Sequence, residues 1–205
     1  MIRRGKLNIN SFKLLPRTFY HQPTLKLAED LLGHVLVKTT DEGTTSGVIV
    51  ETEAYLGASD QAAHSYQNRR TKRTEIMFQT PGHVYTYQMH THCLVNVVSG
   101  EEGNPQAVLI RAVEPYTGIE LMEKRRPVKK PKNLTNGPGK LTKALGINMS
   151  DYGRTFFGSP IYIASGSPPE KERVERGPRI GIDNAGEARD YPYRFWIKDN
   201  PYVSR

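Results

Sequence analysis

The chain has 205 residues, of which 37% are apolar and 24% are charged, a balance that is typical of a globular domain and excludes a disordered chain. Lys and Arg number 29 against 21 Asp and Glu, so the net charge of +8 at neutral pH favours a polyanion such as nucleic acid as the partner. A single cysteine, Cys93, excludes a disulfide framework and a Cys-x-x-Cys site, and no apolar run approaches the roughly 18 residues that a membrane span needs.

The N-terminal segment predicts an arm followed by a helix. Residues 1–15 lack a sustained apolar period, and no secretory h-region follows their basic start. We therefore expect a flexible basic arm over 1–15, one domain over 16–205, and a soluble, cytoplasmic protein. Apolar side chains have helical spacing over 24–32, and Gly33 stands where a C-terminal cap belongs.

The following segments predict an antiparallel sheet. Residues 34–40 and 45–55 are typical of two strands, and the turn at 41–43 joins them into a hairpin. Further short strands are predicted within 84–98 and at 107–113, 160–164, 179–182 and 193–198. The chain shows no internal repeat and no domain-sized break in composition, so we expect a single domain.

Basic residues concentrate in three segments. Residues 67–74 have almost no apolar side chain and predict a loop, and 123–132, with six basic residues and two prolines, predicts another. Gly137 and Pro138 open a predicted helix, whose N-terminus is a candidate anion site. The candidate contacts to a phosphate backbone are Arg69, Arg70, Lys72, Arg73, Lys140 and Lys143. A merely solvated surface explains the same charges.

Two carboxylates, Glu51 and Glu53, stand at the exit of an apolar, β-branched strand. Because side chains alternate along a strand, both glutamates are expected to share a face with Ile49 and Tyr55, and either could project into a site. Arg111 lies inside an apolar run, where a buried guanidinium needs an anionic partner. Both glutamates are candidates for that partner, and a structural ion pair is the ordinary explanation.

His64 suggests two kinds of chemistry. A carboxylate on the strand, Glu53, and an imidazole on the following loop can share a pocket and activate water. Alternatively, His90 and His92 would lie on one face of an extended strand and, with His64 and the glutamates, could bind a metal. The ordinary alternatives are a surface carboxylate and histidines that only pack.

An aromatic and imidazole set lies among the basic loops. Its members are Tyr55, Tyr85, Tyr87, His64 and His90. Flat rings are what stacking on an exposed base needs, but tyrosine also suits a half-buried pleated sheet. The spacing alone leaves both interpretations open.

With these residues in view, the chain resembles the alkyladenine (3-methyladenine) DNA glycosylase family, the monofunctional base-excision repair enzymes that release alkylated purines. The likeness covers about Phe19 to Ser204 and rests on separated matches, in the same order, at 51–57, 60–65, 77–78, 81–82, 85–87, 96–99, 109–115, 136–141 and 194–196. It implies an α/β mixed (α+β) single domain with a curved antiparallel β-sheet core and surrounding helices. It also implies a monomer with no metal, no other cofactor and no lyase lysine, which binds double-stranded DNA containing alkylated purines and is then associated with the nucleoid.

The resemblance assigns catalytic roles within the strand pair. Glu53 matches the general base that deprotonates the water attacking C1′ of the sugar. Arg111 matches the arginine that helps to hold that water. Glu51 is left as a structural or supporting carboxylate.

The resemblance also assigns a base pocket. Its expected walls, which sandwich the flipped base, are Tyr55, His64 and Tyr87. Asn96 matches the residue whose side chain crowds the exocyclic amino group of normal guanine. Between Tyr87 and Asn96 the chain is one residue shorter than the family pattern and lacks the family's intercalating tyrosine. Met89, as an apolar wedge, or His90, as a stacking plane, is expected to fill the gap left by a flipped nucleotide.

We therefore expect a monofunctional DNA N-glycosylase of base-excision repair. It would flip out purines of the 3-methyladenine and 7-methylguanine type and hydrolyse the N-glycosidic bond with an activated water, leaving an abasic site. Two other classes stay open from the residues alone. A non-catalytic basic β-domain that binds RNA or single strands leaves Glu53 and Arg111 unexplained, and a His-dependent metallohydrolase would lose activity in EDTA.

Overall fold

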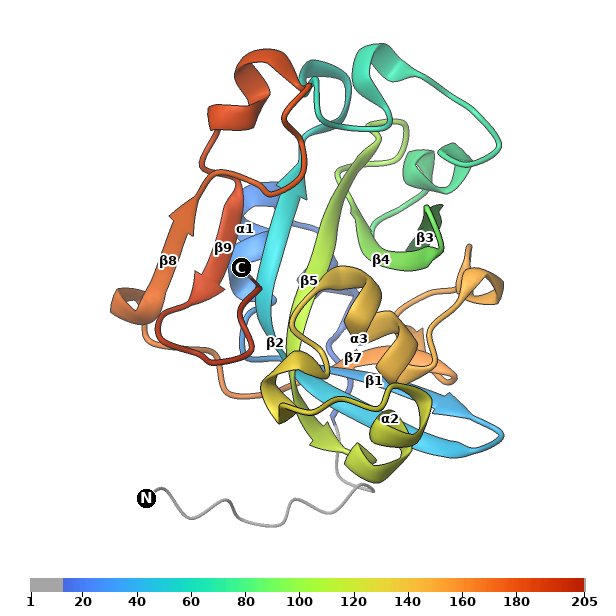
Figure 1. Cartoon of the computed structure of the whole chain (residues 1–205). Helices are drawn as coiled ribbons and strands as arrows, with labels where there is room; N and C mark the ends of the chain where they lie inside the picture. Colours follow the sequence, from blue (N-terminus) through green and yellow to red (C-terminus); the bar gives the residue numbers. More distant parts are fainter. Residues whose placement is uncertain (1–12, 205) are drawn as a thin grey trace.

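A computed structural model of the protein describes residues 13–204 (Figure 1). Residues 1–12 of the predicted arm lie outside these described residues. The end of that arm contacts the sheet: Leu14 forms a β-bridge with Ala164, and the N–H of Leu15 donates to the carbonyl of Ile163 at 3.0 Å. Leu15 is buried in the hydrophobic core, so the packed fold begins before the boundary expected at residue 16.

Nine antiparallel strands within the described residues form one curled sheet in a single domain, as the resemblance implies (Figure 1). They are β1 (Val35–Thr40), β2 (Gly43–Tyr55), β3 (Val84–Met89), β4 (His92–Ser99), β5 (Gln106–Thr117), β6 (Phe157–Gly158), β7 (Ile161–Ala164), β8 (Val174–Gly177) and β9 (Arg194–Ile197). The main path has the order β3-β4-β5-β2-β1-β7-β6, and β9 pairs with β2 and with β8. Strand β2 is long enough to pair with β1 over its first half and with β9 near its end, which lets the sheet curl around it.

Three α-helices of the described part of the chain pack on this sheet, namely α1 (Thr24–Asp30), α2 (Ile119–Arg125) and α3 (Pro138–Leu145). Helix α3 begins at Pro138, whose missing N–H would have no partner in a first turn, and it ends where Gly146 adopts a φ of +79°. The N–H of Gly146 donates to the carbonyl of Thr142 and so closes the last turn. None of the helices within residues 13–204 has the length and apolar character that crossing a bilayer requires.

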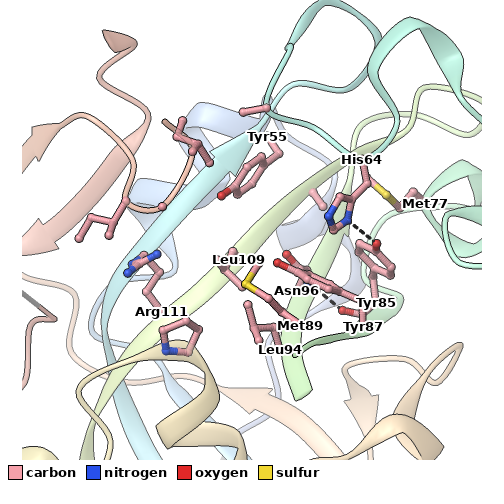
Figure 2. Close-up of a pocket in the computed structure, with 16 residues that line it drawn as sticks. Tyr55, His64, Met77, Tyr85, Tyr87, Met89, Leu94, Asn96, Leu109 and Arg111 are labelled. Carbon is pink, nitrogen blue, oxygen red and sulfur yellow. Dashed lines mark hydrogen bonds between the residues drawn. The ribbon is translucent and has the colours of Figure 1, made fainter. Parts of the chain in front are cut away.

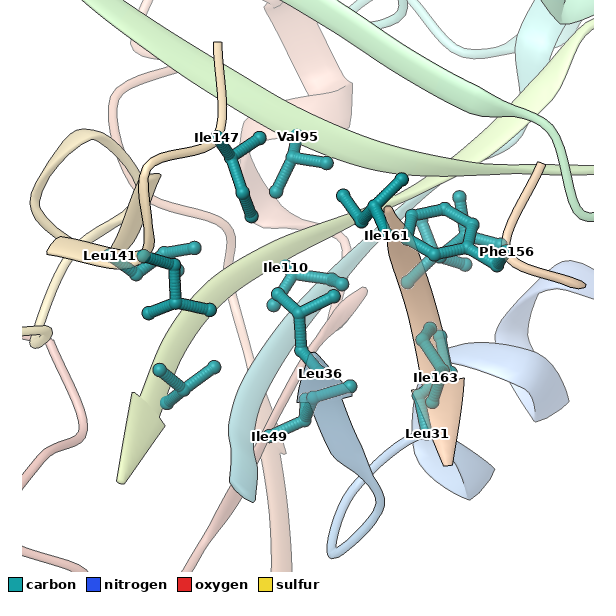
Figure 3. Packing of buried hydrophobic residues seen from close by; sticks show 14 of the residues in the cluster. Leu31, Leu36, Ile49, Val95, Ile110, Leu141, Ile147, Phe156, Ile161 and Ile163 are labelled. Atoms are coloured by element: carbon teal, nitrogen blue, oxygen red, sulfur yellow. The ribbon is translucent and has the colours of Figure 1, made fainter. Parts of the chain in front are cut away.

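One large hydrophobic core joins the helices to the sheet. Figure 3 shows Leu31, at the end of α1, and Leu141 of α3 in the same packed cluster as Ile49 and Ile110 of the two central strands. Burying each such side chain contributes about 2 kcal/mol, so this cluster holds both helices in place. A smaller cluster lies on the other face of β3, β4 and β5, where alternate side chains point toward a cavity.

Most of the predicted elements are present. The helix predicted over 24–32, the hairpin, the helix opened by Pro138, and the strands predicted at 107–113, 160–164 and 193–198 correspond to α1, β1–β2, α3, β5, β7 and β9. Two predictions are wrong. Residues 179–182 form no strand, because Arg179 turns into a buried ion pair. The segment 123–132 is not wholly a loop, because α2 continues to Arg125. Strand β8 was not predicted, since its Val-Glu-Arg-Gly sequence has no apolar alternation.

Candidate active site

Two irregularities in the pairing of β2 with β5 position the acidic residues. The register shifts between Ile49 and Glu51 and again between Glu51 and Thr52, where Arg111 is the extra residue on β5. Ile49 therefore lies in the hydrophobic core with Leu36 (Figure 3), and the prediction that it shares a face with the glutamates is wrong. Glu51 and Glu53 do share a face, because both contact Arg111.

The three side chains form a buried charge cluster. The side chains of Glu51 and Glu53 are 0% exposed, and Arg111 is buried beside them. Arg111 Nε lies 3.1 Å from Glu51 Oε1, and Arg111 Nη1 lies 3.1 Å from Glu53 Oε1, which confirms both glutamates as its anionic partners. Burial acts to lower the pKa of Arg111, but the charges of Glu53 and Glu51 raise the pKa above its usual value. The guanidinium is therefore a fixed positive charge.

Three donors hold the Glu53 carboxylate. Arg111 Nη1 and the N–H of Ile180, the latter at 2.8 Å, contact Oε1, and the Tyr55 hydroxyl donates to Oε2 at 2.8 Å. Burial and the charge of Glu53 raise the pKa of Tyr55 well above its usual value, so this hydroxyl stays a donor. Among the described residues Oε2 accepts no second hydrogen bond, which leaves a lone pair for water.

A cavity of about 360 Å³ lies in front of this carboxylate (Figure 2). Its lining residues are Tyr55, Ala62, His64, Met77, Tyr85, Tyr87, Met89, Leu94, Asn96, Ala107, Leu109, Arg111, Pro138, Ile180, Gly181 and Ile182. Glu53 itself does not line the cavity, but all three residues that donate to it do. The carboxylate therefore stands directly behind the cavity wall.

Aromatic rings form two sides of the cavity. Figure 2 shows Tyr55 on one side and His64, Tyr85 and Tyr87 on the other. The rings of His64 and Tyr87 meet edge to face with centroids 4.5 Å apart, and Tyr85 stacks on Tyr87 at 5.5 Å. The three expected walls are thus brought to one cavity, and Tyr85 supports two of them.

His64 is an uncharged wall at neutral pH. Its Nδ1 and the Tyr85 hydroxyl share a hydrogen bond of 2.7 Å. Burial, together with the nearby charges of Arg73 and Arg69, lowers the pKa of His64 to about 4.

A buried ion pair, which the sequence reasoning missed, supports the Tyr55 side. Arg179 and Asp60 make two contacts of 2.5 and 2.8 Å, with side chains only 0% and 1% exposed. The Arg179 guanidinium also lies over the Tyr55 ring, 4.7 Å from its centroid. The next residue in the chain is Ile180, whose N–H donates to Glu53. The available signal was an arginine beside apolar residues, the same pattern that singled out Arg111.

The floor of the cavity includes Asn96, whose side chain is fixed. Its Nδ2 donates to the carbonyl of Tyr85, the residue opposite it in the β3–β4 pair, at 3.0 Å. Its side-chain oxygen accepts no hydrogen bond from residues 13–204 and stays available to a ligand.

The two candidates for the intercalating position differ in placement. Met89 lines the cavity and is 43% exposed, whereas His90 lies in the hairpin turn with a φ of +52°. The expected common face of His90 and His92 on an extended strand is therefore wrong, because the turn separates them. Within the described residues no group of three His, Cys, Asp or Glu side chains could hold a metal ion.

The six candidate backbone contacts divide into two groups. Arg70 makes two contacts to Glu75, at 2.9 and 2.6 Å, and lies over the Phe78 ring, and Lys140 donates to Asn136 Oδ1 at 2.9 Å. Of the six candidates, Arg69, Lys72, Arg73 and Lys143 are exposed and have no ion-pair partner among residues 13–204. These four are the better placed for a phosphate backbone, because neither an internal anion, as at Arg70, nor a side-chain amide, as at Lys140, competes for them.

Comparison with known proteins gives a consistent result. The matching family model is described as methylpurine-DNA glycosylase (MPG) and covers residues 18–201. A Bacillus subtilis (strain 168) protein is 66% identical over 191 residues, which are 93% of this chain and 96% of the relative. Relatives from Oceanobacillus iheyensis and Listeria monocytogenes serotype 4a are 60% and 52% identical, over 95% and 91% of this chain and 98% and 89% of their own lengths. All three are named as candidate 3-methyladenine DNA glycosylases.

Proposed function

Since the chain belongs to the methylpurine-DNA glycosylase family, we propose that it flips alkylated purines out of duplex DNA and hydrolyses their N-glycosidic bond with a water activated by Glu53. Membership makes the protein a hydrolase that acts on DNA. The flipping, the role of each residue, the 3-methyladenine and 7-methylguanine lesions, and the absence of lyase chemistry are parts of the proposal.

One observation carries the proposal: the buried Glu53 carboxylate, held by three donors, stands behind a cavity with aromatic walls. An anionic carboxylate at this place can accept a proton from water and also stabilise positive charge that develops on the sugar in an oxocarbenium-like transition state. Arg111 contacts the same carboxylate and lines the cavity, so it can hold the attacking water.

The cavity also suits the leaving group. Alkylation at N3 or N7 makes a purine cationic and already a good leaving group, so the protein needs mainly to flip, stack and orient it. A cation against the faces of Tyr55 and Tyr87 gains about 0.5–2 kcal/mol that a neutral purine does not. His64, whose pKa of about 4 keeps it neutral at pH 7, adds no repulsion to a cationic base.

Asn96 supplies a means of exclusion. Its hydrogen bond to the Tyr85 carbonyl keeps its side chain from turning away, so it would crowd the exocyclic amino group of normal guanine. A fixed side chain of this kind discriminates against normal guanine by lowering its affinity for the cavity.

We propose Met89 as the wedge that fills the gap left by the flipped nucleotide. It combines exposure with a place at the cavity, whereas His90 is held in the turn beyond it. Met89→Ala should weaken binding to lesion-containing duplex, while His90→Ala should change it little. The opposite result would give the role to His90.

The decisive experiment is base release by Glu53→Gln from methylated duplex DNA. This variant should bind lesion-containing duplex as the wild type does but lose at least about 100-fold in the rate of base release, the usual contribution of a general base. The exposed Glu170→Gln is the matched control and should behave as wild type. Release by Glu53→Gln at the wild-type rate would remove Glu53 from its role.

The same assay separates the remaining classes. A non-catalytic nucleic-acid-binding domain would free no methylated base, and a metallohydrolase would lose activity in EDTA. Borohydride treatment during turnover should trap no covalent protein–DNA adduct, because a trapped Schiff base would mean lyase chemistry.

A further inference from the structure

The C-terminal end of the described chain enters the buried charge cluster. Figure 1 shows this end lying over β2, and Ser204 is only 5% exposed. The Ser204 N–H donates to Glu51 Oε2 at 2.6 Å, and its hydroxyl donates to Glu51 Oε1 at 2.8 Å. The same hydroxyl oxygen accepts from Arg111 Nη2 at 3.2 Å and from Nε at 3.4 Å.

Arg194 of β9 closes this arrangement from the other side. Its Nε donates to Glu51 Oε1 at 2.7 Å, and its Nη2 donates to the carbonyl of Ser204 at 3.0 Å. Its guanidinium also lies over the Trp196 ring, with Cζ 4.6 Å from the ring centroid. Ser204 is thus held through its N–H, its hydroxyl and its carbonyl.

These contacts determine which edge of Arg111 faces the site. A guanidinium presents five donors in a rigid planar fork, so binding one edge orients the others. Arg111 Nε contacts Glu51, and Arg111 Nη2 donates to the Ser204 hydroxyl. The remaining nitrogen, Nη1, is the one that contacts Glu53. If the Ser204 hydroxyl were missing, Nη2 would lose its partner and the guanidinium could rotate toward either carboxylate.

We propose that Ser204, with Glu51 and Arg194, forms a C-terminal clasp that positions Arg111 for base release. The three are positioning residues, because they act through Arg111 and do not line the cavity. The inference rests on the proposed roles of Glu53 and Arg111. It assigns a task to Glu51 beyond neutralising charge, and it connects Ser204, at the end of the described residues, to the proposed site through Arg111.

The test measures single-turnover base release and the dissociation constant for lesion-containing duplex in the same variants. Ser204→Ala should release base about 10-fold more slowly, the effect of a catalytic group displaced by less than 1 Å, with a dissociation constant within about twofold of wild type. Ser204→Thr keeps the hydroxyl and should restore the rate. Ser165→Ala, at an exposed serine, is the control and should leave both values unchanged.

A double-variant comparison distinguishes positioning from general damage. In an Arg111→Ala background, Ser204→Ala should cause no further loss of rate, because its effect passes through the arginine. A wild-type rate for Ser204→Ala, or an equal further loss in that background, would overturn the clasp. If Ser204→Ala does not fold, Arg194→Lys replaces it, because this variant loses the donor to the Ser204 carbonyl. It should likewise release base more slowly while its dissociation constant for the duplex stays close to that of the wild type.

The outcome is distinguishable from failure of the proposed function. If Glu53→Gln abolishes base release while Ser204→Ala is normal, the clasp is wrong and the function stands. If Glu53→Gln keeps the wild-type rate, the proposed function fails whatever Ser204 does.

Discussion

Asp60→Ala should destabilise the protein strongly, because it leaves Arg179 buried without its anion. Asp60 is buried and accepts both guanidinium contacts, and its two oxygens also accept the N–H groups of Leu56 and Ala62, at 3.0 and 3.1 Å. Burial acts to lower the pKa of Arg179, while the hydrogen bonds and charge of Asp60 raise it. Because a guanidinium is not deprotonated in proteins, Arg179 stays charged even when the carboxylate is removed.

The size of the effect follows from these contacts. Removing one partner of a buried ion pair costs about 3–5 kcal/mol, since the remaining charge has neither water nor a counter-charge. Arg179 would keep its hydrogen bonds to the carbonyls of Ala54 and Ala188, at 2.8 and 3.1 Å, but these neutral acceptors do not neutralise its charge. Its Nε is already buried without a hydrogen-bond partner among the described residues. Against a typical total of about 5–15 kcal/mol, the loss should be visible as a large decrease in the urea midpoint.

Urea unfolding of four proteins measures the effect: wild type, Asp60→Ala, Arg179→Met and the double variant. The double variant should be more stable than Asp60→Ala alone, because it removes the unpaired charge and keeps an apolar side chain against Tyr55. A loss of less than about 1 kcal/mol for Asp60→Ala would refute the reasoning, since it would mean that water reaches the stranded guanidinium.

The remaining predictions concern pH and salt. The pKa of His64 is about 4 in the folded protein, against an ordinary value of 6.5, so the unfolded chain binds more protons between these two pH values. The contribution of neutral His64 to the free energy of unfolding is therefore complete above pH 6.5 and is lost as the pH falls toward 4. His64→Gln should remove about 2 kcal/mol of the stability difference between pH 7 and pH 4, allowing for the partial exposure of the ring, and an unchanged difference in urea unfolding would contradict this assignment. Arg69→Ala with Arg73→Ala should reduce the slope of log affinity for duplex against log salt by about 2, measured by titration at several salt concentrations. Arg70→Ala, which loses an internal partner, should leave the slope nearly unchanged, and an equal decrease for Arg70→Ala would refute the division of these cations.

Local patterns predicted the parts of the structure that depend on neighbouring residues. The alternation in β2 placed Glu51 and Glu53 on one face, and the Gly137–Pro138 pair marked the start of α3. An arginine in an apolar run was enough to predict that Arg111 needs a carboxylate. Each of these inferences requires only the geometry of one strand or helix and the high energy of an unpaired buried charge.

Other features depend on how distant segments meet. The register shifts that move Ile49 into the core come from the pairing of β2 with β5, and no periodicity within one strand encodes them. The Glu75 carboxylate accepts two hydrogen bonds from Arg70, although in the sequence Arg70 is one of four similar cations in a loop. The composition of a segment therefore does not predict which of its cations will form an ion pair with an internal carboxylate.

The sequence by itself determined the family resemblance, an antiparallel sheet with a few short helices, and Glu53, Arg111 and the aromatic walls as candidates. Only the tertiary structure decided their surroundings. Asp60 and Arg179 are separated by 119 positions and Glu51 and Ser204 by 153, yet each pair is in direct hydrogen-bond contact. The physical reason is that a buried carboxylate can accept a hydrogen bond from any donor that packing brings within about 3 Å. Which donor lies there is determined only when the whole sheet has closed.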